Sequence, residues 1–196
     1  MNKHTTPQAG YIAVAAKKFA AEGYHGTSLD AVAREAGVTK QALLHFFGTK
    51  KKLYEAVLSD LAARQCAEID QVATDSPAQH LSDYFSSFGS LSIVQSNDAR
   101  LVIHALLDSE SNAQNWPMKP YLDRLIELVL AVPEGKINSR GEALAWIFQI
   151  VGAIQYFAIS STAITGMYGS GDAQSSARHF EKLIASGVAS LSAPRK

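Results

Sequence analysis

The sequence predicts an all-α protein of about nine helices. An N-terminal three-helix helix-turn-helix domain (residues 1–52) would precede a helical C-terminal domain (53–196). Apolar residues recur at helical spacing between breaks rich in Gly, Pro, Ser and Asn, and none of the segments resembles a strand. A length of 196 residues and an apolar content of 47% allow the larger domain a core of its own.

The first helix of the predicted motif begins after Thr27 and Ser28, which are good N-cap residues. From Leu29 onward, apolar residues follow at i+3, i+4 and i+7, which predicts one buried face. Gly37 comes directly after the last of them, where a helix end favours a left-handed residue. The break between the two helices is therefore predicted to be short.

The second helix is predicted over residues 40–47, with Thr39 as its cap and Leu43 and Phe47 on its buried face. Four other side chains of this helix are left for the major groove of DNA: Lys40, Gln41, Leu44 and His45. Gln can bond adenine and Lys can bond guanine there, so Lys40 and Gln41 are the base-reading candidates.

A turn and cap at Gly48 and Thr49 then start a further helix with three lysines, residues 50–52. The helix macrodipole disfavours cations at this end, whereas a nearby phosphate would reverse the penalty. The free backbone N–H groups of a helix N-terminus also bind anions. This end is thus predicted to hold a DNA strand.

The stretch EGYHGTSLDAVAREAGVTKQALLHFFGTKKKLYEAV resembles the N-terminal domain of the tetracycline-repressor (TetR) family of bacterial regulators. The resemblance covers about the first 57 residues. Its matching positions include Phe19, Glu22, Gly23, Tyr24, Thr27, Ser28, Ala33, Ala36, Gly37, Val38, Phe47, Thr49 and Lys50.

The resemblance implies a DNA-binding head on a helical body that dimerises and binds a small ligand, whose occupancy releases DNA. By position it also implies individual contacts: phosphate for Thr27 and Ser28, bases or backbone for Thr39, Lys40 and Gln41, the DNA strand for His45, and a phosphate clamp for Lys50.

Four positions depart from the family pattern. Leu44 stands where Tyr is common and Phe46 where His or Tyr is usual, so an apolar contact to a thymine methyl would replace a phosphate hydroxyl. Lys51 and Lys52 stand where an acidic residue is frequent, which predicts stronger non-specific attraction to DNA.

Charge is distributed unevenly along a chain whose formal net charge is zero. Residues 1–52 hold eight Lys and Arg against three Asp and Glu, and the remainder holds ten against fifteen. A basic head on an acidic body is expected when one end approaches nucleic acid. A solvated charged face, or a helical adaptor that uses the basic head for protein contacts, is the alternative interpretation.

In the body, breaks predict six further helices at about 50–72, 77–95, 98–110, 117–132, 140–165 and 173–191. Residues 143–159 are almost wholly apolar, which indicates a core or interface helix and, as the less favoured alternative, a membrane span. One face of 173–191, with Phe180, Ile184, Val188 and Leu191, is predicted to form a homodimer's four-helix bundle with 140–165, unless that face packs within its own chain.

A ligand pocket is expected between residues 77 and 157, where aromatic walls with a few polar groups would suit an apolar or aromatic effector. Its candidate residues are Phe85, Phe88, His104, Leu107, Trp116, Tyr121, Trp146, Gln149 and Tyr156. Aromatic residues at helical spacing are more often ordinary core. A core histidine is likewise the favoured interpretation of His104, and a structural thiol that of Cys66.

The sequence holds no GxSxG, phosphate loop, HExxH or CxxC motif, so neither an enzyme, a metal site nor a cofactor is predicted. A single cysteine fits a reducing cytoplasm, and the N-terminus lacks a secretory signal. The tail MNKHTTPQAG is expected to be disordered before the first helix, or to carry Lys3 into the minor groove.

Overall fold

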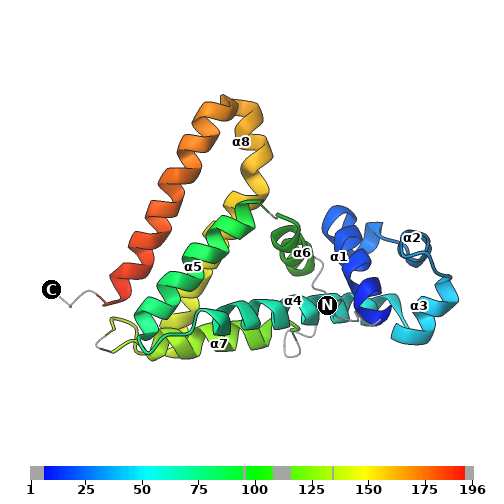
Figure 1. Cartoon of the computed structure of the whole chain (residues 1–196), viewed down its shortest axis with the longest axis horizontal. Helices are drawn as coiled ribbons and strands as arrows, with labels where there is room; N and C mark the ends of the chain where they lie inside the picture. The colour runs from blue at the N-terminus through cyan, green and yellow to red at the C-terminus, as the bar shows by residue number, and fades with distance from the viewer. Residues whose placement is uncertain (1–6, 95, 108–115, 134, 193–196) are drawn as a thin grey trace, which may run out of the picture. The chain divides into compact units, whose positions relative to one another are not determined.

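The computed structural model describes residues 7–94, 96–107, 116–133 and 135–192, and these residues form eight α-helices and no strand (Figure 1). One of the eight bends sharply in its middle into two straight stretches. The predicted all-α fold with about nine helices is therefore confirmed.

The helices are α1 (Pro7–Gly26), α2 (Leu29–Glu35), α3 (Lys40–Phe47), α4 (Lys50–Gln71), α5 (Pro77–Val94), α6 (Ser96–Leu107), α7 (Lys119–Leu130) and α8 (Arg140–Ala189). A 3-10 turn over Ser190–Ser192 follows α8. The breaks predicted at 76–77 and near 96 agree with these bounds, and most of the break predicted from 112 to 117 lies outside the described residues.

The helices group into two compact units, residues 1–63 with 100–118 and residues 64–99 with 119–196. In the first unit α2 packs on α1 and α3, around buried side chains such as Phe19, Val32 and Leu43. In the second unit α5, α7 and α8 pack on one another around Tyr84, Tyr121 and other apolar residues. Helices α4 and α6 each contribute residues to both units, and the predicted domain boundary at 52–53 stays a prediction.

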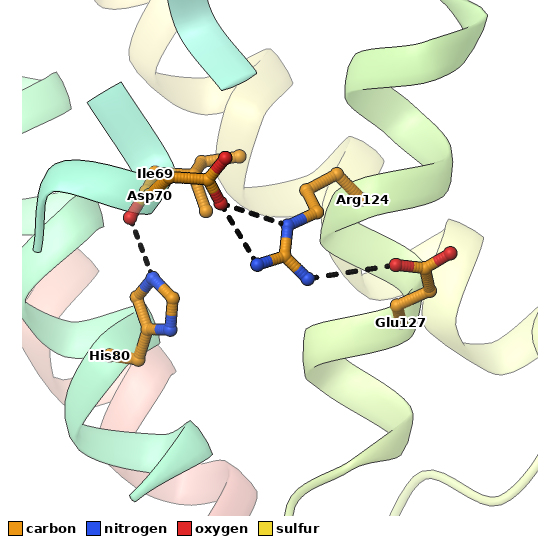
Figure 2. Close-up of polar contacts among 5 residues, drawn as sticks. All are labelled: Ile69, Asp70, His80, Arg124 and Glu127. Carbon is orange, nitrogen blue, oxygen red and sulfur yellow. Dashed lines mark hydrogen bonds and ion pairs between the residues drawn. The ribbon is translucent and has the colours of Figure 1, made fainter. Parts of the chain in front are cut away.

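Two polar contacts hold the C-terminal end of α4 within the second unit (Figure 2). The guanidinium of Arg124, on α7, lies 2.9 Å from the Asp70 carboxylate and 3.6 Å from Glu127. His80, on α5, is buried, and its Nε2–H donates to the Ile69 carbonyl at 2.7 Å. That carbonyl is in the last turn of α4 and also accepts the Val72 amide at 3.3 Å, so His80 adds a second hydrogen bond at this helix end.

The bend in α8 occurs at Gly169, whose φ of 82° and ψ of 166° are not helical. Glycine adopts such a positive φ without the steric penalty that a Cβ brings. The break predicted between 166 and 171 is thus correctly placed. However, it is a single-residue bend, because the residues on both sides of Gly169 continue the helix.

The prediction of a dimer interface on the apolar face of residues 173–191 is wrong, because that face is not exposed. Ile184, Val188 and Leu191 are buried within the chain itself, and Phe180 stacks on Phe157 with ring centroids 4.3 Å apart. A Cβ on Gly187 would lie 3.1 Å from Ile150, so the two stretches of α8 approach closely there. Local periodicity identifies an apolar face but not the surface that covers it.

The expectation for the N-terminal tail needs a correction as well. Helix α1 begins at Pro7, so the last four residues of MNKHTTPQAG are helical. Proline suits the first turn of a helix, because its missing N–H would have no helical partner there. Lys3 lies outside the described residues.

Candidate nucleic-acid interface

The helix-turn-helix forms through the caps that its sequence supplies. The Ser28 hydroxyl accepts the Ala31 amide at 3.1 Å, and the Thr39 hydroxyl accepts the Ala42 amide at the same distance. Gly37 has a φ of +69°, as the short break requires. The predicted span of α3, residues 40–47, is confirmed, as is the burial of Leu43 and Phe47.

The opposite face of α3 is available to a ligand. Lys40, Gln41 and His45 are exposed, and Leu44 is half-buried. A helix whose two inward residues are anchored presents such a face in a fixed orientation, which is what an element must do to enter a major groove.

Phe46 is an exposed aromatic residue at the end of α3, with 47% of its surface accessible. It contacts Tyr11 of α1 edge to face, with ring centroids 5.4 Å apart. The sequence marks Phe46 only as a departure from the family pattern, because nothing local shows that two aromatic side chains from α1 and α3 meet.

Thr27 has a structural role in this unit. Its side chain is 2% exposed, and its hydroxyl donates to the Gly23 carbonyl at 2.8 Å, as does its amide at 3.3 Å. Both donors of Thr27 are thus used in closing the corner between α1 and α2. A phosphate contact from its hydroxyl would require that bond to break.

Gly23 itself has a φ of 68°, and a Cβ placed on it would lie 3.0 Å from Nδ1 of His104, on α6. His104 therefore packs against the corner of α1 within the first unit, so closely that a Cβ at position 23 would require its ring to shift.

Ion pairs account for all three acidic residues of residues 1–52. The Lys18 ammonium lies 3.0 Å from Glu35 and 3.7 Å from Glu22, and the hydrogen bond that it donates to the Glu35 carboxylate raises the pKa of Lys18. The Lys40 ammonium lies 2.8 Å from Asp30. Lys40, a base-reading candidate, is therefore neutralised in the free protein.

Lys50 has a different kind of neighbour. Its ammonium lies over the ring of Tyr24, 4.4 Å from the ring centroid. The Thr49 hydroxyl caps α4 by accepting the Lys52 amide at 3.1 Å, as predicted. Tyr24 matches the family pattern in the sequence, but its contact with Lys50 joins residues that are distant in the chain.

Several residues predicted to bind a ligand are core residues of the second unit. Phe85, Phe88 and Tyr121 are buried, and the Tyr84 hydroxyl donates to the Tyr121 hydroxyl at 3.0 Å. The pKa of both tyrosines is raised, and burial is the largest cause. Phe85 also contacts Trp146 edge to face, at 5.7 Å between centroids.

The remaining ligand candidates differ in exposure and in the unit to which they belong. Leu107 and Tyr156 are 79% and 70% exposed, and Gln149 is exposed as well. His104, Leu107 and Trp116 belong to the first unit, whereas the other candidates belong to the second. The ligand-binding role of the whole set stays a prediction.

One hollow of about 440 Å³ lies between α5 and the second stretch of α8. Apolar Phe85, Phe180 and Ile184 line it together with charged Arg178 and Lys182. Phe85 is the one member of the predicted ligand set that borders it.

Sequence reasoning also missed a buried amide. Gln65 of α4 is 3% exposed, and its Oε1 has no hydrogen-bond partner among the described residues. Close to it in the chain, burial raises the pKa of Glu68 and of the Cys66 thiol. A raised thiol pKa lowers the thiolate fraction, which agrees with a structural cysteine. Among the described residues, no group of three His, Cys, Asp or Glu side chains could hold a metal.

Residues 12–57 match the model of the bacterial regulatory proteins of the tetR family. The HTH-type transcriptional regulator RutR from Escherichia coli (strain K12) is 42% identical to this chain over 50 residues. That stretch is 26% of this chain and 24% of RutR, so the chain spans about a quarter of the length of this curated relative.

The fold of more than nine-tenths of the chain is similar to that of solved regulators. A TetR transcriptional regulator from Legionella pneumophila superposes with a TM-score of 0.68 and 20% identity, covering 93% of this chain and 98% of that one. The regulator FadR from Bacillus subtilis, solved in complex with stearoyl-CoA, has a TM-score of 0.63 and 19% identity, covering 91% and 97%. At these identities the likeness shows the fold alone.

Proposed function

We propose that this chain, which belongs by its N-terminal domain and its fold to the tetR family of bacterial regulatory proteins, is a ligand-responsive repressor. It would bind a palindromic operator in a sequence-specific manner. The observation that carries the proposal is the exposed face of α3, held by the buried Leu43 and Phe47. Gln41 and His45 on that face have groups that bond base edges or phosphates.

The proposed DNA contacts are Ser28, Thr39, Lys40, Gln41, Leu44, His45 and Lys50. Thr27 supports this surface from beneath, through its bond to Gly23. For Lys40 to reach a guanine, DNA must replace Asp30 as its partner. This exchange of partners would favour DNA only at a base that offers two acceptors to the ammonium, as guanine does with O6 and N7.

A homodimer is proposed because α8 exposes large apolar side chains within a single chain. Phe148, Tyr156, Met167, Tyr168 and Leu183 are each at least half exposed. A second copy would cover them, and two-fold symmetry would double the contacts at a palindromic site. Sedimentation as a monomer at micromolar concentration would contradict this interface.

By length and composition, α8 would also pass as a membrane-spanning helix, and 39% of its most apolar window is buried. One such helix is weak support for a membrane protein, since core and interface helices have the same composition. The proposal of an interface predicts that purified dimer stays in the aqueous phase with lipid vesicles. Flotation of the dimer with vesicles would favour the membrane interpretation.

The effector is proposed to be largely apolar or aromatic and to bind in the body. FadR, with a similar fold, was solved with stearoyl-CoA, which supports an apolar ligand class for this fold. Helix α4 contributes to both units, and its last turn is tied to Arg124 and His80. Ligand-driven movement of α4 would change the spacing of two recognition helices that must match successive grooves about 34–36 Å apart.

Ligand and DNA binding would then oppose each other, with a reciprocal coupling of typically about 1–3 kcal/mol. Equal affinity of a candidate effector for free and DNA-bound protein would refute release by that effector. Because its target is the operator, the protein is proposed to act in the cytoplasm.

The decisive experiment is selection from a random duplex pool by the purified protein, followed by salt-titrated affinity for the enriched site. A recovered palindrome is expected. Binding that is salt-sensitive but independent of sequence would remove the groove-reading role of α3. No binding to any duplex would favour the alternative of an adaptor whose basic head contacts protein.

A matched pair of variants tests the reading face directly. Gln41→Ala, on the exposed face, is expected to weaken operator affinity by about 1–3 kcal/mol for each half-site, and to leave affinity for unrelated duplex unchanged. Gln71→Ala, at the exposed end of α4, is the control and should change neither.

A further inference from the structure

The contact between Tyr24 and Lys50 places a cation where the helix alone would repel it. Lys50 is the first residue of α4, and its ammonium lies 4.4 Å from the centroid of the Tyr24 ring. The positive end of the macrodipole disfavours a lysine at this position. The negative face of an aromatic ring attracts the ammonium and offsets that effect.

The ring that receives Lys50 is itself held by an aromatic cluster. Tyr24 lies 5.2 Å from Tyr54 and 6.3 Å from Phe19, between ring centroids, and Phe19 and Tyr54 contact each other at 4.7 Å. Phe19 is fully buried. The orientation of the Tyr24 face is therefore set by the core of the first unit.

An aromatic partner acts differently from the carboxylates that hold Lys18 and Lys40. Glu35 neutralises Lys18 and Asp30 neutralises Lys40, whereas a ring orients an ammonium without cancelling its charge. Among the described residues, no ion pair involves Lys50. Its charge thus remains available to an anion, and its stem has already lost part of its rotamer freedom.

We propose that Tyr24 is a positioning residue for DNA binding, which holds the Lys50 ammonium ready for a backbone phosphate at the N-terminus of α4. The inference rests on the proposed DNA-binding function. Backbone N–H groups of the same helix end would share the phosphate. Tyr24 would act through Lys50 and would itself contribute no base contact.

A double-mutant cycle on Tyr24 and Lys50 tests the proposal, with salt-titrated affinity for one fixed duplex of arbitrary sequence as the readout. The slope of log affinity against log salt is negative, and Lys50→Ala is expected to reduce its magnitude by about 0.9 per protomer. Tyr24→Leu should weaken binding about two- to fivefold per protomer and should also make the salt dependence shallower. In the Lys50→Ala background, Tyr24→Leu should have no further effect.

Two further variants separate positioning from structure. Tyr24→Phe keeps the ring face and is expected to bind like the unaltered protein. Trifluorophenylalanine at position 24 keeps the ring but weakens its negative face, so it should reproduce the loss seen with Tyr24→Leu even if that variant fails to fold.

Lys51, exposed beside Lys50, supplies the control. Lys51→Ala should weaken binding by the same factor with or without the Tyr24 substitution. The proposal is overturned if the Tyr24 substitutions weaken binding equally with and without Lys50, or if the fluorinated ring binds as well as phenylalanine.

Failure of the inference can be told from failure of the proposed function. If random-pool selection enriches no site but the cycle on the fixed duplex shows the expected coupling, operator reading fails and the role of Tyr24 stands. If the unaltered protein binds no duplex, both are overturned.

Discussion

The Lys40 ammonium lies 2.8 Å from the Asp30 carboxylate, so the first residue of α3 is tied to the first turn of α2. Both side chains are largely exposed, and an exposed pair of this kind contributes at most about 1 kcal/mol to folding. Its greater consequence concerns binding, because Asp30 neutralises a cation on the exposed face of α3 that is proposed to enter the major groove.

Asp30→Asn is therefore expected to release Lys40 and to steepen the salt dependence of affinity for arbitrary duplex by about 0.9 per protomer. Thermal stability should change little. Glu55→Gln removes the same charge from an exposed position on α4 and is the matched control. Equal effects of the two substitutions would mean that only net charge matters, and not the pairing of Lys40.

Gly23→Ala should destabilise the protein through two separate costs. A φ of 68° disfavours any Cβ, and this Cβ would also lie 3.0 Å from His104. Such backbone strain typically costs about 1–3 kcal/mol. Gly37→Ala, at a φ of +69° with no atom close to the new Cβ, measures the first cost alone.

Chemical denaturation should rank Gly23→Ala as more destabilising than Gly37→Ala. Adding His104→Ala to Gly23→Ala should recover only the steric part of the loss. His104→Ala could instead cause the same loss of stability in the Gly23→Ala variant as in the parent protein. In that case the contact between the two residues would contribute nothing to stability.

The Tyr84 and Tyr121 hydroxyls should contribute jointly to stability. Removing one leaves the other buried without its partner, which costs about 1–3 kcal/mol. Tyr84→Phe combined with Tyr121→Phe should therefore cost less than the sum of the two single substitutions. Additive losses in denaturant titrations would show that the hydroxyls do not depend on each other.

The same pair predicts alkaline destabilisation. Burial raises the pKa of both phenols above the ordinary value of 10, so the unfolded chain loses these protons at lower pH than the folded protein. Stability is then fully present well below pH 10 and falls as pH rises through it, approaching a limiting slope of about 1.4 kcal/mol per pH unit for each tyrosine until the folded protein also loses the proton. The double Phe variant should show a shallower fall between pH 10 and 11. An unchanged slope would assign the alkaline loss to other groups.

Gln65→Met is expected to stabilise the protein by about 1 kcal/mol. A buried amide oxygen with no partner in the described structure pays for desolvation without a hydrogen bond, and methionine fills a similar volume. Gln71→Met, at an exposed position, should leave the unfolding midpoint unchanged. A loss of stability in Gln65→Met would show that the amide has a partner worth more than its desolvation.

Sequence alone determined the features that depend on neighbouring residues. The bounds of α3, its Thr39 cap, the positive φ of Gly37 and the break near Gly169 follow from capping, glycine freedom and apolar spacing within a few residues. The exposed face of α3 follows as well, because burying Leu43 and Phe47 turns the rest of that helix outward.

Tertiary structure alone decided which residues distant in the chain meet. It placed the Lys50 ammonium on Tyr24 and packed His104 against Gly23. It also turned Ile184 and Val188 of α8 inward, against the prediction. Periodicity shows that a helix has an apolar face, but the partner of that face depends on how the helices pack, and packing energy is shared among residues that no local pattern connects.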